Sequence, residues 1–362
     1  MLRSGLAFLV VLGVLVFIHE LGHYLAARWR GVHVEAFSIG FGQALASWTD
    51  RSGTIWKLAW IPLGGYVKLH GQERPQDVPA KVRATWIPGR TFHEKPVLSR
   101  MIIVAAGPAA NFVLAMVLFT GLFAIAGKPA VPVVSEVRTN SAAAHAGFAP
   151  GDQIEAINGA HVDSFEDVQR MVSARPGEPL TVRVLRDGQD RDLQIVTETE
   201  VSGGRRVGVM GVRGSNTAFV RVPPLEAIRD GAVQTWDVTA QTVVGVSQMI
   251  TGRRGTDDIG GPLRIAQLSG QVAELGLASL VSFIAVLSVN LGLINLIPIP
   301  LLDGGHLLFY LAEAVRGRPI SPRAQEYGFR AGLALLVSLF IFATWNDLTH
   351  LGLFRWVAGL IG

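Results

Sequence analysis

The sequence of 362 residues contains no cysteine and few charged residues. The absence of cysteine excludes disulfide bonds and thiolate metal sites, so any metal ion must be bound by His, Asp or Glu. Charged residues make up 17% of the chain and hydrophobic residues 49%, a balance typical of a membrane protein. The formal net charge is only +4 and the basic residues are scattered, which argues against nucleic-acid binding.

Four apolar segments are candidates for membrane-spanning helices: residues 6–27, 101–126, 277 to about 299, and 332 to about 345 with some extension. The last is the shortest. No Ala-x-Ala-like cleavage site follows the first segment, which we therefore interpret as a retained helix and not as a signal peptide. Residues 301–315 are also apolar but contain Asp303 and two glycines, so they predict a broken continuation of the third span.

The distribution of basic residues predicts the topology. Residues 28–100 contain eleven Lys or Arg against five Asp or Glu, and residues 316–330 contain four against one. Because loops rich in Lys and Arg stay in the cytoplasm, both segments are expected there. Residues 127–276 then lie on the opposite face, which in a bacterium is the periplasm. We expect a multi-pass protein of the bacterial inner membrane.

Changes in composition predict four regions. Residues 1–126 and 277–362 form two halves of a membrane core. Residues 127–202 contain short alternating strands such as 180–188 and a helix starting at Ser164, so they predict a soluble α+β module. Residues 203–276 predict a connector with an amphipathic helix over 223–249. In residues 53–71, β-favouring residues flank Pro62 and a turn at Gly64-Gly65, which predicts a hairpin near the membrane.

The first apolar segment contains the sequence HELGH, with His19, Glu20 and His23. On a helix, residues four apart project from the same face, so both imidazoles can bind one zinc ion while the glutamate acts as general base toward an attacking water. Buried ionisable groups at membrane depth are costly unless they are paired or bind a ligand. The location therefore favours a zinc site over chance occurrence.

A catalytic zinc usually has three protein ligands, so a third must come from elsewhere in the chain. Asp303 is the best candidate, because it is a carboxylate at the end of an apolar span whose direction brings it to a depth similar to that of the histidines. His306 is a rival ligand, although a histidine at a helix end near the membrane surface explains it more simply.

The segment before Asp303 is predicted to be unwound. Pro298 and Pro300 remove two backbone donors there, which leaves backbone groups free to bind an extended peptide. Asn295 lies near this break and is a candidate for binding a substrate backbone or a developing oxyanion. A hydrogen bond between helices is the alternative role for Asn295, and the favoured role for Asn290.

Together these segments resemble the site-2 proteases, a family of intramembrane zinc metalloproteases, and are most similar to the regulator-of-sigma-E protease branch. The resemblance covers nearly the whole chain and is carried by HELGH (residues 19–23), GGYVKL (64–69), GPAANF (107–112), NLIPIPLLDGGH (295–306) and WND (345–347). It implies a membrane α-helical fold of about four transmembrane helices, with an inserted periplasmic PDZ-like α+β domain and a membrane-associated β-hairpin able to pair with an unwound substrate.

The resemblance also implies roles for individual residues. His19, His23 and Asp303 become the ligands of Zn²⁺, Glu20 the catalytic base, and Asn295 a substrate-binding residue. Residues 141–162 are similar to bacterial PDZ domains, with residues 147–148 beginning the region that binds a chain terminus. We find a single PDZ-like copy, whereas many relatives of this branch carry two, and we favour a role for it as a steric filter that excludes bulky ectodomains.

The predicted function is cleavage of single-span membrane proteins within the lipid bilayer, on the cytoplasmic side, with anti-sigma factors or remnant signal peptides as substrates. One alternative is a membrane-bound PDZ adaptor with a vestigial metal site, against which the intact ligand set argues. The other is a metal transporter, which would need a continuous polar path that the outer halves of the spans lack.

Overall fold

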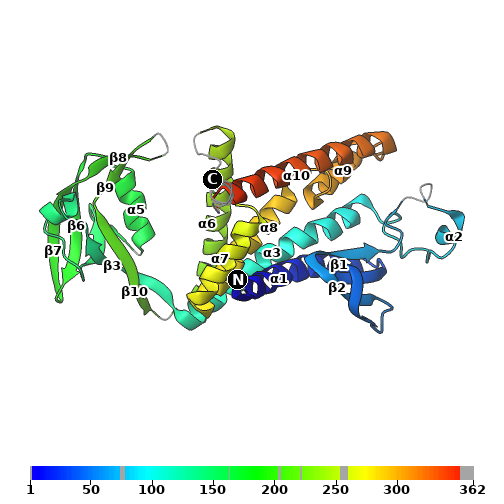
Figure 1. Ribbon diagram of the computed structural model, residues 1–362, viewed down its shortest axis with the longest axis horizontal. Coiled ribbons are helices and arrows are strands. Elements are labelled where there is room, and N and C mark those ends of the chain that lie inside the picture. Colours follow the sequence, from blue (N-terminus) through cyan, green and yellow to red (C-terminus); the bar gives the residue numbers. More distant parts are fainter. Residues whose placement is uncertain are drawn as a thin grey trace, which may run out of the picture. The chain divides into compact units, whose positions relative to one another are not determined.

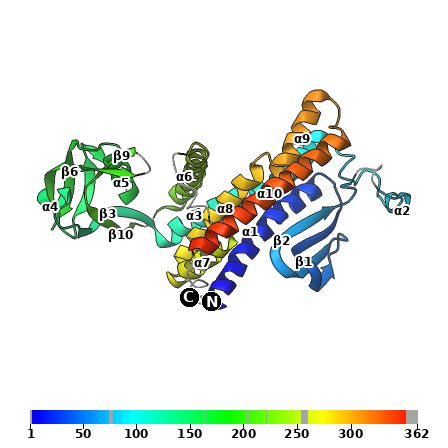
Figure 2. The same ribbon diagram turned by 45° about the horizontal axis from the view of Figure 1, so that its top comes forward.

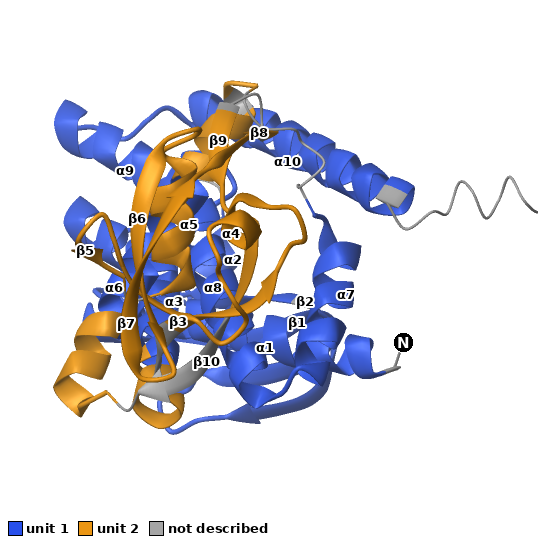
Figure 3. Ribbon diagram, turned by 90° about the vertical axis from the view of Figure 1, so that its left-hand side faces the viewer, with its two compact units in different colours: residues 1–119, 231–243, 256–362 blue, residues 120–230, 244–255 orange. Residues whose placement is uncertain are grey.

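The structure is a computed structural model that describes residues 2–73, 78–162, 164–202, 205–220, 222–252 and 260–350. The chain divides into two compact units, coloured blue and orange in Figure 3. The first comprises Met1–Phe119, Gly231–Val243 and Thr256–Gly362, and the second comprises Thr120–Asp230 and Val244–Gly255. The division into four regions stays a prediction.

Among the described residues, four helices are long and apolar enough to cross a membrane (Figure 1). They are α1 (Leu2–Trp29), α3 (Val97–Ala126), α8 (Leu277–Leu296) and α10 (Pro322–His350). The predicted number of spans is therefore confirmed. In the first unit, Val11 and Leu15 of α1 form a buried cluster with Ile284 of α8, which holds these two apolar helices together.

The fourth helix contains the predicted apolar range and the extension expected for it. It begins ten residues before that range, because α10 starts at Pro322. Proline is well suited to the first turn of a helix, where a backbone N–H has no partner to lose. The following turns contain Glu326 and Arg330, which form an ion pair of 2.6 Å across one turn. Because of these charged residues, the first turns of α10 are not part of an apolar run.

The third span ends earlier than predicted, and the predicted broken continuation is a separate helix. Helix α8 stops at Leu296, and α9 (Asp303–Arg316) begins after a six-residue break. The break contains Pro298 and Pro300, which have no N–H to continue a helical hydrogen-bond pattern. Leu301 adopts a φ of 99°, a value that L-residues rarely take, so the chain turns sharply just before Asp303.

The N-terminus of helix α7 (Pro262–Glu274) is capped by a carboxylate that is distant in the sequence. Asp347 of α10 is buried and accepts hydrogen bonds from the backbone amides of Gly261 at 2.8 Å and of Leu263 and Arg264 at 3.1 Å. A carboxylate at a helix N-terminus satisfies unpaired amides and favours the helix dipole. The aspartate of the WND sequence therefore attaches α7 to α10.

Strands β1 (Val34–Thr49) and β2 (Ile55–Leu69) form an antiparallel sheet beside α1, as Figures 1 and 2 both show. The predicted hairpin within residues 53–71 is wrong in its pairing. Residues 36–39 pair with 65–68 on one side and with 55–58 on the other, so the two arms expected to pair are separated by a segment of β1. The long β1 supplies a central strand that lies outside the predicted range. Helix α2 (Ala80–Arg83) follows.

The connection between β1 and β2 is fastened to α1 by Asp50. Its carboxylate accepts hydrogen bonds from the backbone amides of Ser52 and Thr54 and from Trp56 Nε1, at 2.8, 3.0 and 3.0 Å. Tyr24 of α1 donates to it at 3.3 Å. Burial acts to raise the pKa of Asp50, but these hydrogen bonds outweigh it and hold the pKa well below its usual range.

The second unit is built around one sheet with strand order β10-β3-β4-β6-β7, and β5 pairs with β4. The predicted helix near Ser164 is confirmed as α5, whose first turn is capped by the Ser164 hydroxyl. Strands β8 and β9 form a separate pair. The elements are β3 (Lys128–Val137), α4 (Ala142–His145), β4 (Gln153–Ile157), β5 (Ala160–His161), α5 (Phe165–Ser173), β6 (Pro179–Arg186), β7 (Gln189–Val196), β8 (Glu198–Ser202), β9 (Arg205–Val209) and β10 (Val212–Val220).

One cavity of this unit is lined by α5 and by β9 and β10. Phe148 is buried in the core of the unit with Ile154 and Val182, where a large apolar side chain stabilises the fold. The predicted start of a terminus-binding region at residues 147–148 stays a prediction. The predicted amphipathic helix over residues 223–249 is present as α6 (Pro224–Ile250).

Candidate metal centre

Helix α1 brings the two histidines of the HELGH sequence together. His19 and His23 lie one turn apart, and their Nε2 atoms are 3.2 Å apart. Their side chains are nearly buried, with exposed fractions of 11% and 13%. Neutral imidazole nitrogens this close together, on a regular helix, are arranged as two donors toward one point.

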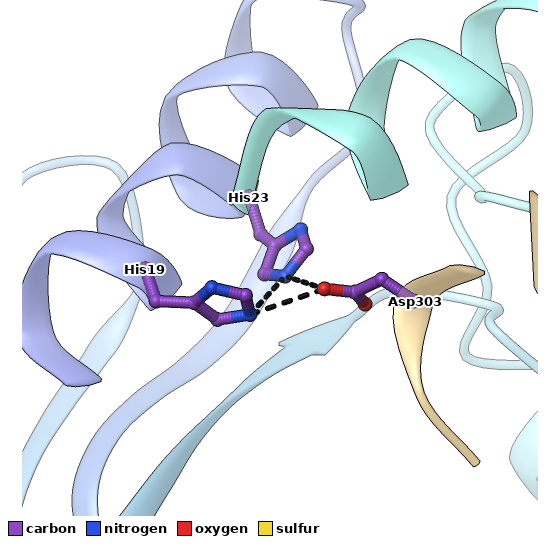
Figure 4. A group of neighbouring side chains, drawn as sticks. All are labelled: His19, His23 and Asp303. Atoms are coloured by element: carbon purple, nitrogen blue, oxygen red, sulfur yellow. Dashed lines mark hydrogen bonds and ion pairs between the residues drawn. The ribbon is translucent and has the colours of Figure 1, made fainter. Parts of the chain in front are cut away.

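Asp303, the first residue of α9, supplies the third donor (Figure 4). Its Oδ2 atom lies 3.1 Å from Nε2 of His19 and 3.4 Å from Nε2 of His23. Gly304 and Gly305 permit this approach, because an added Cβ would lie 2.3 Å from the carbonyl oxygen of Ile297 in one case and 2.4 Å from that of Ile299 in the other. The break after α8 thus determines the position of the carboxylate.

The three donors fit a zinc ion. Donor atoms bound tetrahedrally at about 2.0–2.1 Å are roughly 3.3 Å apart, which agrees with the separations between the three donor atoms. Asp303 Oδ2 is buried, and beyond the two imidazoles the described residues offer it no hydrogen-bond partner. Two imidazole nitrogens that present lone pairs leave this carboxylate oxygen unsatisfied, and a cation between the three atoms would satisfy it. Within the described part of the chain, His19, His23 and Asp303 are the one group of His, Asp or Glu residues suited to hold a metal ion.

Helix α3 contacts the other side of both histidines. Nδ1 of His23 lies 2.9 Å from the backbone carbonyl oxygen of Ile103, and Nδ1 of His19 lies 3.1 Å from the Nδ2 atom of Asn111. The sequence alone did not reveal these contacts. The only signal was the GPAANF sequence, which served as a family marker without a role for any of its residues.

A cavity of about 750 Å³ opens beside the three donors and is lined by the remaining predicted site residues, Glu20, Asn295 and His306. His306 is not part of the donor group; its ring instead packs near Phe329, at a centroid distance of 5.4 Å. Gly65 of β2 also lines the cavity, and a Cβ there would lie 3.2 Å from Cγ of Glu20. The strand thus passes directly beside the expected catalytic base.

An ion pair that the sequence did not predict lies at the wall of this cavity. The guanidinium of Arg100 on α3 donates to both carboxylate oxygens of Glu313 on α9, at 2.7 and 3.2 Å, and lies 4.9 Å from the ring centroid of Tyr310. Both charged side chains are 15% exposed. Because a bidentate pair has a defined geometry, it fixes α9, and hence Asp303, relative to α3.

Comparison with known proteins agrees with this chemistry. The family model described as peptidase family M50 matches residues 7–339, which is most of the chain. The chain belongs to peptidase family M50. This confirms the resemblance to the site-2 proteases, and it makes the protein a zinc-dependent peptidase that is integral to a membrane.

Similar proteins match over almost their full length. A protein of Rhizobium meliloti named as a zinc metalloprotease is 47% identical over 358 residues, covering 95% of this chain and 96% of the relative. Metalloprotease MmpA of Caulobacter vibrioides is 39% identical, with 97% of each chain covered. Zinc metalloprotease RasP of Geobacillus kaustophilus is 32% identical, covering 96% of this chain and 98% of the relative.

A solved structure, the PDZ domain of an SdrC-like protein from Listeria monocytogenes, matches 25% of this chain and 90% of its own length. The sequence identity is 17% and the TM-score is 0.22.

Proposed function

We propose that this M50 peptidase cleaves transmembrane segments of single-span membrane proteins, with His19, His23 and Asp303 as zinc ligands and Glu20 as catalytic base. The observation that supports it best is the meeting of these three donors beside a cavity that Glu20 lines. Two of the donors and Glu20 belong to α1, a helix long and apolar enough to cross a membrane. A peptidase site in such a helix favours substrates that are themselves within the bilayer.

In this mechanism each residue has a separate task. The two imidazoles and the Asp303 carboxylate would hold the metal, three protein ligands being the number expected for a catalytic site. Bound zinc would supply Lewis-acid chemistry, polarising the scissile carbonyl and making a water molecule more acidic. Glu20 accepts the proton of the attacking water and returns it to the leaving amine. Asn295, at the cavity wall, donates a hydrogen bond to the substrate backbone or the developing oxyanion.

The substrate backbone would bind along β2. Residues 65–68 pair with residues 36–39 on one side, and no described strand pairs with their other side. Gly65, Tyr66 and Val67 line the cavity. An unwound substrate segment can add to such an edge through backbone hydrogen bonds, which hold it extended beside Glu20. Extension matters, because the carbonyls of a helix are already hydrogen-bonded and shielded.

The sheet also carries features of a membrane-associated element. Leu45, Trp48 and Trp60 are exposed apolar side chains, with exposed fractions of 59%, 57% and 71%. Exposed apolar side chains on one small sheet favour contact with lipid, and tryptophan favours the membrane interface. This supports the predicted association of the β1–β2 sheet with the bilayer, near the substrate helix that it would bind.

For the cellular setting, we propose the bacterial inner membrane with the metal centre toward the cytoplasmic side and the PDZ-like unit in the periplasm. The basic loops at residues 28–100 and 316–330 support this orientation. Anti-sigma factors and remnant signal peptides are the proposed substrates in regulated intramembrane proteolysis. The PDZ-like unit would act as a steric filter, admitting a substrate only after another protease has shortened its outer domain.

The test separates the enzyme from a PDZ adaptor with a vestigial metal site. The Glu20→Gln variant should bind zinc normally but fail to cleave a model single-span substrate that the wild-type chain cleaves. The Asp303→Ala variant should lose zinc. Wild-type turnover by Glu20→Gln would rule out the proposed base, and full zinc stoichiometry in Asp303→Ala would rule out the third ligand. An adaptor would capture the substrate without cleavage by either chain.

A further inference from the structure

One face of α3 contacts both proposed histidine ligands from behind. The contacts come from Ile103, Gly107 and Asn111, which are spaced four residues apart and therefore share a face of the helix. All three residues are buried. This face places one hydrogen-bonding group beside the ring of His23 and one beside the ring of His19. Between these two groups it leaves room for a ring.

The space is made by Gly107. A Cβ added there would lie 2.3 Å from Nε2 and 2.4 Å from Cε1 of His23, a distance at which the ring could not stay in place. With the ring seated against Gly107, its Nδ1 atom lies 2.9 Å from the carbonyl oxygen of Ile103. A carbonyl oxygen can only accept, so Nδ1 of His23 is the protonated nitrogen and Nε2 keeps its lone pair for the metal.

The second ring faces a side chain instead of a carbonyl. Nδ1 of His19 lies 3.1 Å from Nδ2 of Asn111, and the Oδ1 atom of the same carboxamide is buried without a partner among the described residues. Figure 4 shows the opposite nitrogen of His19 directed at Asp303. The two ends of a carboxamide have the same shape and exchange places by a half-turn, so the chemistry of the ring decides which end it meets.

That chemistry differs between the two states of His19. When Nε2 binds zinc, the neutral ring must carry its proton on Nδ1, and only the oxygen of Asn111 can accept it. When Nε2 instead donates to Asp303, 3.1 Å away, Nδ1 is a lone pair and the amide nitrogen donates to it. The carboxamide can therefore satisfy either tautomer, which a carbonyl such as that of Ile103 cannot do.

We propose that Asn111 is a positioning residue for zinc binding: its side-chain oxygen accepts the Nδ1–H of His19 and holds that ring in the tautomer that presents Nε2 to the metal. The inference rests on the proposed ligand set. The backbone of Asn111 is itself anchored, because the buried Ser288 hydroxyl of α8 donates to its carbonyl oxygen at 2.7 Å. The carboxamide thus extends from a fixed point between α3 and α8.

The experiment measures the zinc affinity of the full-length chain, purified in detergent, by competition with a zinc-binding indicator. Asn111→Leu keeps the approximate volume but has no acceptor, and its affinity should fall about 10–100-fold, as for the loss of other groups that orient a metal ligand. Asn111→Asp keeps an acceptor and should bind zinc within a few-fold of wild type. Ser269→Ala, which removes a buried hydrogen bond of 2.7 Å to the carbonyl oxygen of Ile265 within α7, is the control and should bind zinc normally.

A purely structural role for Asn111 gives a different result. Both Asn111 variants would then lower the thermal stability of the metal-free chain and leave zinc affinity unchanged. Unchanged affinity in Asn111→Leu, or a tenfold loss in a folded Asn111→Asp, would overturn the proposal. If neither variant folds, NMR of the zinc-loaded wild-type chain decides, since the proposal requires the Nδ1–H of His19 to be coupled through a hydrogen bond to the side-chain carbonyl carbon of Asn111, and the absence of that coupling would overturn it.

This outcome is separable from the ligand assignment. His19→Ala removes a donor atom itself and should abolish stoichiometric zinc binding, whatever Asn111 does. Zinc retained by His19→Ala would refute the proposed ligand set. Zinc lost by His19→Ala but held with full affinity by Asn111→Leu would refute only the role of Asn111.

Discussion

The two halves of the metal centre are held in different ways. His19 and His23 are presented by an uninterrupted helix, α1, and are supported from behind by a second helix, α3. Asp303 follows a break in which two prolines and a residue with positive φ replace regular structure. A regular helix sets the spacing of its side chains by local geometry, whereas an irregular segment keeps its position only through its surroundings. A substitution that adds atoms beside the histidines should therefore weaken zinc binding more than one that adds atoms beside Asp303, because the segment before Asp303 can shift.

The largest loss of zinc affinity is expected from a substitution that crowds the histidines on α1. In Gly107→Ala, the new Cβ would overlap the ring of His23, and two packed helices cannot move apart easily. Overpacking of about 3 kcal/mol at this point corresponds to a loss of zinc affinity of roughly a hundredfold. Zinc competition measures it. Gly121→Ala on the same helix, where nothing lies within 4 Å of the added atom, is the control and should have no effect.

A substitution that crowds the segment around Asp303 should reduce zinc affinity less. In Gly304→Ala, the added Cβ would lie 2.3 Å from the carbonyl oxygen of Ile297 in the break and 2.4 Å from that of Leu296, the last residue of α8. The carbonyls at the end of a helix have no intrahelical partner, so both can tilt away more easily than a ring packed between two helices. We expect a loss of zinc affinity of roughly tenfold, near the lower end of overpacking costs. The same titration compares the two variants. A loss in Gly304→Ala equal to or greater than that in Gly107→Ala would show that the break is as rigid as the helix.

Removing the ion pair between Arg100 on α3 and Glu313 on α9 tests whether it holds α9, which begins at Asp303, in place. Glu313→Gln leaves Arg100 largely buried without its countercharge, which should destabilise the fold by about 3 kcal/mol. A lower thermal midpoint, with zinc still bound at saturating concentration, is the expected result. Glu326→Gln, which removes the exposed pair with Arg330, is the control and should change stability by less than about 1 kcal/mol. Equal effects of both substitutions would mean that the inner pair does not hold α9.

The smallest effect is expected at Leu301, whose φ of 99° is unfavourable for a side chain. Leu301→Gly relieves strain of about 1 kcal/mol, and little buried surface is lost because the side chain is 44% exposed. A small rise in the thermal midpoint should follow. A clear fall would indicate that this side chain, which lines the cavity, contributes more by packing than its backbone strain costs.

Much of the candidate site could be predicted from local patterns. The proximity of His19 and His23 follows from four-residue spacing on a helix, and Asp303 was predicted because few ionisable residues lie beside the apolar spans. The start of α10 could not be found in this way, since charged residues cover its first turns. The pairing of β2 was also missed, because a strand from outside the predicted hairpin lies between its two arms.

The sequence by itself determined the chemistry available: a chain without cysteine, whose first apolar helix presents two imidazoles and a carboxylate on neighbouring positions. Helical repeat and side-chain type are local properties, so they can be read from consecutive residues. Only the tertiary structure decided that Oδ2 of Asp303 meets both Nε2 atoms, that Gly107 leaves room for a ring, and that Asn111 lies behind His19. These contacts join residues about 80 to 280 positions apart, and their distances depend on how whole helices pack.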